Sequence, residues 1–144
     1  MTNEDEAVKQ ATFNFYAAIE DLIAGRGLAR MKEAWHHTPR VTGGHPSGEW
    51  AEGWEEVCAT WEVFASFGRP DRGGSSVKSM KVHVYDDTAY ATVLFVASPA
   101  WGGDTLACTN VLHKAGGAWR VVHHHADKSP AMGIALERII AEGG

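Results

Sequence analysis

The order of patterns along the sequence predicts an α+β fold, with helices packed on one face of a curved antiparallel sheet. Helical apolar spacing fills the first half of the chain, and the alternation typical of strands fills the second half. A glycine pair, Gly116–Gly117, separates two alternating segments, as in a two-residue hairpin turn. There is no internal repeat or linker, so we expect one domain, 1–144.

Three segments have the spacing of amphipathic helices. In 2–24 a capping residue, Thr2 or Asn3, precedes apolar positions that recur on one face of a helix. The segments 28–35 and 50–68 predict a short second helix and a third helix. Residues 36–49, between them, are rich in Gly and Pro, which indicates irregular or hairpin structure.

Four segments of the second half alternate as strands do. They cover 75–85, 88–98, 105–115 and 118–127. With a two-residue turn between the last two, Asn110 lies opposite His123 and Cys108 opposite His125. This register places His123 and His125 on the inward face beside Asn110, and His124 on the outer face, where it could contact a dimer partner. A bulge near His123 would reverse this assignment beyond that point.

The composition excludes several classes of protein. With 44% hydrophobic and 22% charged residues, the chain is typical of a soluble globular protein. A net charge of −5 and the absence of a basic run argue against a nucleic-acid partner. No run of about 18 apolar residues and no leader pattern occur, so we expect no membrane association and a cytoplasmic location. Cys58 and Cys108 lie in apolar patterns and are expected to be buried without a disulfide.

Three segments carry a resemblance to a known family: 40–57 (RVTGGHPSGEWAEGWEEV), 109–127 (TNVLHKAGGAWRVVHHHAD) and 129–132 (SPAM). Together with the element order, they resemble small SnoaL-like proteins, of the DUF4440 type, in the NTF2-like superfamily. The last hairpin is also similar to the association domain of calcium/calmodulin-dependent kinase II. The resemblance covers essentially the whole chain. It implies a cone of three N-terminal helices on a curved sheet, one enclosed pocket, and a homodimer formed through the outer face of the sheet.

Ketosteroid isomerase has the same fold and offers a comparison of site residues. It uses an Asp base after the second helix, a Tyr on the first helix and an Asp on the penultimate strand. In this sequence Asn110 occupies the position of the strand Asp, no carboxylate occurs at 43–45, and Tyr16 is out of register with the helix Tyr. The resemblance therefore argues against steroid isomerisation. It leaves a pocket with Asn110 as a hydrogen-bond donor and histidine as the evident base.

The candidate catalytic residues are His123, His125 and Asn110. A neutral imidazole can accept a proton near neutral pH, and Asn110 could stabilise developing oxyanion charge. The alternative is that both histidines are hydrogen-bonded core residues. The candidate ligand-binding residues are His45, His37, Trp54, Trp61 and Asp127.

Each ligand-binding candidate has its own reason. The resemblance places His45 at the pocket rim, and His37 is the histidine of the pair 36–37 that we expect to face inward. Trp54 and Trp61 are expected pocket walls, since flat aromatic side chains suit a flat apolar ligand. Asp127 could orient an imidazole or be an exposed carboxylate at the end of the strand.

A metal site is a further alternative. His123-x-His125 could be completed by His45 or His37 and Asp127, but nothing in the spacing fixes a third ligand. We therefore expect neither metal nor cofactor. The sequence predicts a protein that binds a small, largely apolar organic molecule, with cofactor-independent isomerisation or cyclisation as its chemistry if it is an enzyme. The alternative from another class is a non-catalytic ligand-binding or assembly module.

Overall fold

The computed structural model describes residues 2–46, 48–128 and 130–143. Its α-helices are α1 (Asn3–Ile23), α2 (Ala29–Ala34), α3 (Gly53–Ser66) and α4 (Pro130–Ala141). Its strands are β1 (Thr42–Gly44), β2 (Trp50–Glu52), β3 (Ser76–Tyr85), β4 (Thr88–Val96), β5 (Thr105–Ala115) and β6 (Ala118–Asp127). Two short 3-10 helices, η1 (Pro70–Arg72) and η2 (Pro99–Trp101), lie in the connections.

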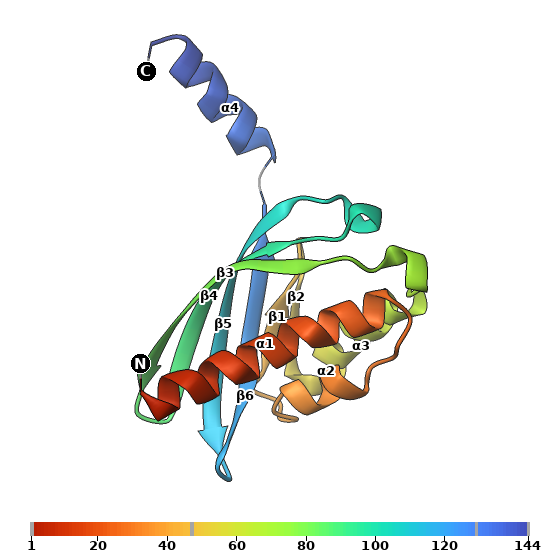
Figure 1. Ribbon diagram of the computed structural model, residues 1–144, viewed down its shortest axis with the longest axis vertical. Helices are drawn as coiled ribbons and strands as arrows, with labels where there is room; N and C mark the ends of the chain where they lie inside the picture. Colours follow the sequence, from red (N-terminus) through yellow and green to blue (C-terminus); the bar gives the residue numbers. More distant parts are fainter. Residues whose placement is uncertain (1, 47, 129, 144) are drawn as a thin grey trace.

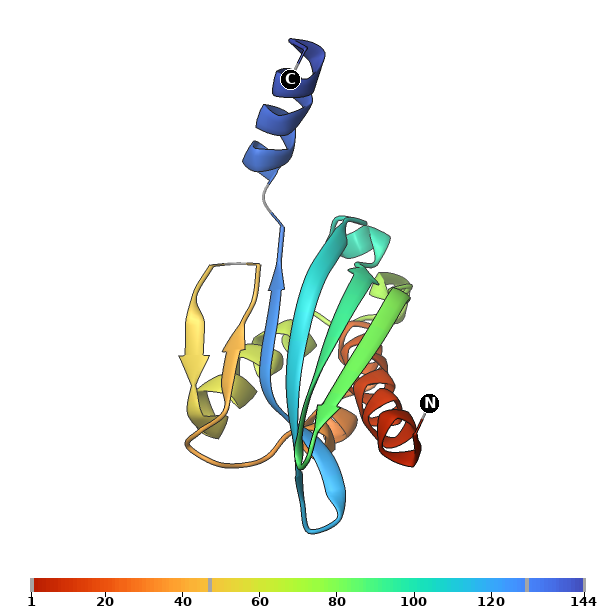
Figure 2. The same cartoon turned by 90° about the vertical axis from the view of Figure 1, so that its left-hand side faces the viewer.

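The first three helices form one layer and the sheet forms the other (Figure 1). The sheet has the order β2-β1-β6-β5-β4-β3, and its curvature is visible from the side (Figure 2). The predicted α+β cone is thus confirmed. It differs in one detail, because β1 runs parallel to β6 and makes the sheet mixed rather than wholly antiparallel.

Local sequence explains where α1 begins and how it packs. The Thr2 hydroxyl accepts a hydrogen bond from the Asp5 backbone N–H at 3.0 Å, and the Asp5 carboxylate accepts one from the Thr2 backbone N–H at 2.9 Å. This capping box satisfies donors that the first helical turn leaves free. The face that α1 presents to the sheet is fully buried at Val8, Phe15 and Leu22, which keep helical spacing.

The last hairpin forms at the predicted turn. Gly116 and Gly117 have φ angles of 60° and 80°, a region that residues with a Cβ rarely adopt, and Ala115 pairs with Ala118. The register then shifts, because Val111 pairs with His123 whereas Leu112 pairs with Val121. One residue of β6 is therefore extra, which is the signature of a β-bulge.

This bulge makes the predicted face assignment of the histidines wrong. Asn110 pairs with His124, not with His123, and Cys108 pairs with Ala126, not with His125. Side chains alternate along a strand, so one extra residue moves every later side chain to the opposite face. His124 consequently points inward, where it is 2% exposed. His123 and His125 point away from the helices.

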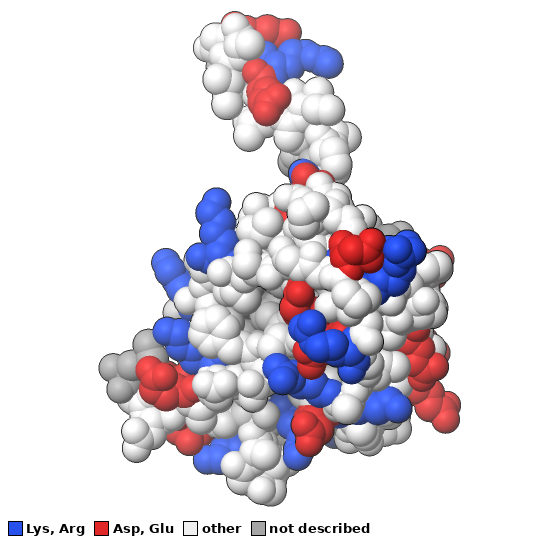
Figure 3. All heavy atoms as spheres, turned by 45° about the vertical axis from the view of Figure 1, so that its right-hand side comes forward, with Lys and Arg blue, Asp and Glu red and all other residues white. Residues whose placement is uncertain are grey.

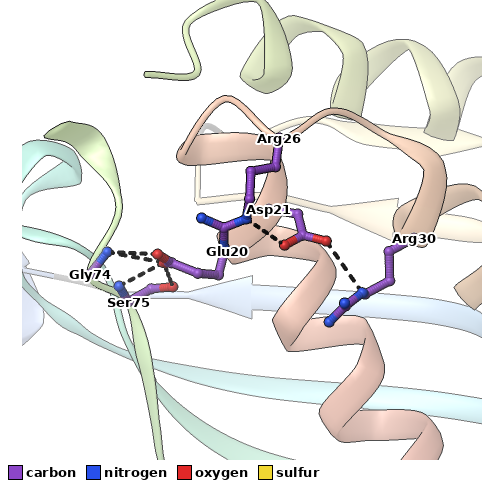
Figure 4. A network of polar contacts seen from close by, with 6 residues as sticks. All are labelled: Glu20, Asp21, Arg26, Arg30, Gly74 and Ser75. Carbon is purple, nitrogen blue, oxygen red and sulfur yellow. Dashed lines mark hydrogen bonds and ion pairs between the residues drawn. The ribbon is translucent and has the colours of Figure 1, made fainter. Parts of the chain in front are cut away.

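A carboxylate near the end of α1 joins this helix to the segment before β3 (Figure 4). Glu20 accepts hydrogen bonds from the Gly74 backbone N–H at 2.9 Å, the Ser75 backbone N–H at 2.9 Å and the Ser75 hydroxyl at 2.6 Å. Burial opposes ionisation of Glu20, but these hydrogen bonds outweigh it and hold the pKa of the carboxyl below its ordinary value. The end of α1 is thereby fixed where its side chains line a cavity.

Replacing Glu20 by alanine is expected to lower the free energy of unfolding by about 1–2 kcal/mol, because three charge-assisted hydrogen bonds at a partly exposed site are lost. Urea denaturation measures the change. Asp21→Asn is the control, since Asp21 makes only surface ion pairs with Arg26 and Arg30 and should cost less than about 1 kcal/mol. Equal losses in the two variants would contradict the anchoring role of Glu20.

The sequence patterns did not predict the C-terminal helix. α4 projects away from the sheet (Figure 1), and Ile134, Leu136, Ile139 and Ile140 on it are each more than half exposed. In Figure 3 this helix is mostly uncharged, with its charged atoms in its outer part. In the part of the chain that the structure describes, no helix combines the length and apolar character needed to cross a bilayer.

Candidate functional site

A cavity of about 420 Å³ lies between the helices and the inner face of the sheet. Its walls are mostly apolar side chains from both layers, including Ile19, Leu22, Trp61, Phe64, Phe95 and Leu106. α1 supplies one wall and α3 the opposite wall, while β4, β5 and β6 form the floor. Such a volume suits a small organic molecule.

A chain of three polar side chains crosses the floor of the cavity. The Asn110 amide nitrogen donates to the Tyr16 hydroxyl oxygen at 2.7 Å, and the Asn110 carbonyl oxygen accepts from His124 Nδ1 at 2.6 Å. Asn110 itself is fully buried, whereas Tyr16 and His124 line the cavity. A chain of this kind holds each member in one orientation, because breaking any bond would leave buried polar groups unpaired.

His124 is held as a neutral imidazole. Burial, reinforced by His45, His123 and His125, holds its pKa well below the ordinary value, so it carries no charge at pH 7. Since the Asn110 carbonyl oxygen can only accept, the proton of His124 is on Nδ1. Nε2 is therefore the unprotonated nitrogen, with a lone pair to offer.

His45 follows β1, and its ring centroid lies 6.1 Å from that of His124. Its Nε2 is 2.9 Å from the Thr60 hydroxyl oxygen, which donates its single proton to the Val57 carbonyl oxygen at 2.6 Å. Nε2 must therefore be the donor, which leaves Nδ1 unprotonated. Burial lowers the pKa of His45 to about 4, so this imidazole is also neutral at pH 7.

Two further groups on the cavity floor keep their protons. Burial raises the pKa of the Cys108 thiol to about 11 and raises that of the Tyr16 hydroxyl as well, and the thiol donates to the Leu106 carbonyl oxygen at 3.8 Å. Neither is an anion at neutral pH, so Cys108 is not an activated nucleophile. Cys108 and Cys58 are both buried and free, as predicted.

The mouth of the cavity is more polar than its interior. Lys128 Nζ lies 2.6 Å from Asp104 Oδ1, and both residues line the cavity together with Trp101. The side chains of this ion pair are 38% and 53% exposed. Charge is therefore confined to the solvent end of the cavity.

The predicted catalytic histidines form a separate cluster on the outer face. His123 Nδ1 lies 2.6 Å from the Thr42 hydroxyl oxygen, and His125 Nε2 lies 3.7 Å from Asp127 Oδ2. The exposed Trp50 packs against both rings, with centroid distances of 5.8 and 5.0 Å. None of these residues lines the cavity. Asp127 does pair with an imidazole, as one alternative proposed, but away from the cavity.

The predicted ligand contacts divide between two regions. His45 and Trp61 line the cavity, and their rings meet edge to face at 4.6 Å. His37 and Trp54 do not line it. They stack on each other at 4.1 Å outside it, because His37 is exposed and its Nε2 binds the Lys32 carbonyl oxygen at 2.6 Å.

Asn110 has a different role from the one expected. Both ends of its amide are engaged by Tyr16 and His124, and it does not reach the cavity. It positions other groups and is not placed to stabilise an oxyanion. The comparison with ketosteroid isomerase also left Tyr16 out of the site, although it lines the cavity. The position of Tyr16 beside the apolar face of the first helix could have indicated its role. A tyrosine buried on that face needs a polar partner for its hydroxyl, and such a partner lies at a polar site.

A metal site is not assembled by these side chains. Among the residues that the structure describes, no group of three or more His, Cys, Asp or Glu side chains could hold a metal ion. The two cavity histidines approach each other, but the acidic side chain at the cavity, Asp104, binds Lys128 at the mouth.

Comparisons with known proteins place the chain in a family. Residues 8–132 match the model of the SnoaL-like domain family. The F-box protein SKIP8 of Arabidopsis thaliana is 27% identical over 120 residues, which are 83% of this chain but 48% of that protein, so the chain spans about half the length of this relative.

Three solved structures have a similar fold. An NTF2-like protein of unknown function from Pseudomonas putida KT2440 has a TM-score of 0.72 at 18% identity, covering 93% of this chain and 92% of its own. A candidate calcium/calmodulin-dependent protein kinase type II association domain from Thiobacillus denitrificans ATCC 25259 has a TM-score of 0.69 at 26% identity, covering 84% of this chain and 94% of its own. A candidate dehydratase of the NTF2-like family from Streptomyces avermitilis has a TM-score of 0.68 at 22% identity, covering 89% of this chain and 97% of its own. Because the family match extends over most of the chain, the protein belongs to the SnoaL-like domain family.

Proposed function

We propose that the cavity binds a small, largely apolar organic molecule. The observation that carries this proposal is a pair of neutral imidazoles, His45 and His124, at a cavity whose walls are otherwise mainly aromatic and aliphatic. Binding sites for small molecules combine such apolar walls with a few well-oriented polar groups. The apolar walls provide affinity, and the polar groups select the ligand.

The same arrangement supports cofactor-independent proton transfer as the chemistry of this site. His124 Nε2 is unprotonated, lines the cavity and is held in place through Asn110. In an isomerisation, it would accept a proton from one carbon of the ligand and return it to another, with no net gain or loss of atoms. His124 takes the role that the sequence suggested for His123 or His125, because the bulge places His124 on the inner face.

A variant that fills the cavity tests the binding proposal. Ala97 lines the cavity, whereas Ala107 lies exposed on the sheet. Ala97→Phe should weaken binding of naphthalene by about tenfold or more, because a phenyl ring occupies the space of the ligand, while Ala107→Phe should leave it unchanged. Ligand-observed NMR, with protein titrated into a fixed naphthalene concentration, gives the Kd. Failure of the unmodified protein to bind naphthalene at millimolar concentration would contradict the proposal.

Self-association is a second candidate function, favoured by α4. Four large apolar side chains of this helix are exposed, and the Thiobacillus structure is named as an association domain. We propose a second copy of this chain as the partner, because these apolar side chains are exposed on a helix that projects away from the sheet (Figure 1). An interface of one short helix would be small, so additional surface such as the outer sheet face would contribute.

Charged substitutions in α4 test the assembly. Leu136→Lys and Ile140→Lys together should shift the protein to monomer in sedimentation experiments, because burying two lysines without partners is unfavourable. Glu137→Lys, at an exposed position of the same helix that is already charged, is the control and should keep the assembly. A protein that is already monomeric at about 100 μM would rule out this second function and leave the cavity proposal intact.

A further inference from the structure

The imidazole and amide donors on the cavity floor are directed at protein acceptors. His124 Nδ1 donates to the Asn110 carbonyl oxygen, and the Asn110 amide donates to the Tyr16 hydroxyl oxygen. The sequence of bonds has one consistent direction, since the Asn110 carbonyl oxygen faces the imidazole and the amide nitrogen faces the phenol. His124 therefore has an acceptor, and not a donor, to offer to a ligand.

The imidazole of His45 also has one protonated and one unprotonated nitrogen, and a different set of hydrogen bonds determines which is which. His45 Nε2 donates to Thr60, whose hydroxyl donates to the Val57 carbonyl oxygen. Two separate hydrogen-bond chains, one from β5 and one from α3, thus leave an unprotonated nitrogen on each cavity histidine. The Trp61 indole N–H has no partner, but its nitrogen is enclosed by protein atoms, so a ligand does not reach it.

We infer that the buried polar group of the ligand is a hydroxyl, of an alcohol or a phenol, which donates its proton to a cavity imidazole. This inference rests on the proposed binding function. An ether or ketone oxygen at the same place would meet a nitrogen lone pair and gain no hydrogen bond. A carboxylate would in addition be buried among apolar walls without a cation, because Lys128 lies at the mouth and is paired with Asp104.

The matched probes 2-naphthol and 2-methoxynaphthalene test this inference. They share the ring system, and both are uncharged at pH 7.5, but only the naphthol can donate a hydrogen bond. Ligand-observed NMR should give a Kd about tenfold lower for 2-naphthol, as expected for one additional buried hydrogen bond and for an unfavourable acceptor–acceptor contact in the ether. Equal affinity, or tighter binding of the ether, would overturn the inference.

Substitutions test whether the cavity histidines cause the tighter binding of 2-naphthol than of 2-methoxynaphthalene. His45→Phe keeps an aromatic ring beside Trp61 and Phe64 but removes one acceptor, and His124→Phe removes the other. The ratio of the Kd of 2-methoxynaphthalene to that of 2-naphthol should fall towards one in at least one variant. His37→Phe, outside the cavity, should keep the full preference. Because His124 is almost fully buried and its variant can fail to fold, a direct measurement on the unmodified protein accompanies the variants.

That direct measurement is the tautomer of each imidazole. Long-range ¹H–¹⁵N NMR at pH 7.5 should show His124 protonated at Nδ1 and His45 protonated at Nε2. The opposite tautomer at both rings would overturn the inference, since both would then point a donor into the cavity. If naphthalene, naphthol and ether all fail to bind, the proposed function itself falls. If naphthalene binds but the naphthol has no advantage, only the hydroxyl inference falls.

Discussion

Replacing Asn110 by alanine is expected to lower the free energy of unfolding by about 3–4 kcal/mol. The substitution leaves His124 Nδ1–H and the Tyr16 hydroxyl without their partner at a buried site, and it also opens a void beneath them. Each unpaired buried group costs about 1–3 kcal/mol, and the void adds to this loss. Urea denaturation at pH 7.5 measures the change.

Asn14→Ala is the matched control for this prediction. Asn14 is an exposed residue of α1 that accepts a hydrogen bond from the Gln10 side chain at 3.1 Å. Its loss should change stability by less than about 0.5 kcal/mol. A similarly small effect at Asn110 would show that the polar chain across the cavity floor does not hold the two layers together.

Acid should destabilise the protein well above the pH range in which carboxylates titrate. The unfolded chain binds a proton at His45 near pH 6.5, whereas the folded protein does so only near pH 4, because burial disfavours the imidazolium. Stability is therefore complete above pH 6.5 and falls as the pH drops from 6.5 to 4. His45 contributes about 2–3 kcal/mol to this loss, given that the ring is only half-buried, and His124 adds to it in the same direction.

Unfolding free energies measured by urea between pH 7.5 and pH 4 test this expectation. His45→Gln should flatten the curve between pH 6.5 and 4, because one proton is no longer taken up on unfolding. His37→Gln, a substitution at an exposed histidine outside the cavity, should leave the slope unchanged. A flat profile in the unmodified protein would mean that burial does not lower the pKa of His45 and His124 in the folded state, and would contradict this prediction.

Much of the fold could be read from local signals. The capping box at Thr2 and Asp5, the glycine pair at the hairpin turn and the period of the apolar residues all act within a few neighbouring positions. The strand β2 was missed, because Trp50–Glu52 carry apolar spacing continuous with α3. What makes them a strand is pairing with β1, a contact across a loop that has no local signature.

The candidate site could be predicted only in part. The sequence singled out the histidine run, Asn110, His45 and Trp61, and the last three are at the cavity or directly beneath it. It chose the wrong members of the run, since a bulge of one residue in β6 exchanges the two faces. The consecutive apolar residues Val121 and Val122 break the alternation at that point, but a break of this kind does not say which residue is extra.

The sequence by itself determined the class of fold, the family resemblance and the polar residue types available for a site, because these depend on composition, spacing and capping. Only the tertiary structure decided which imidazole faces the cavity and which of its nitrogens carries the proton. The first depends on the register of β6 against β5, and the second on hydrogen-bond partners that lie 14 residues away for His124, at Asn110, and 15 residues away for His45, at Thr60. These partners meet only once β6 has paired with β5 in its bulged register and α3 has packed beside the segment after β1, so no local pattern encodes them.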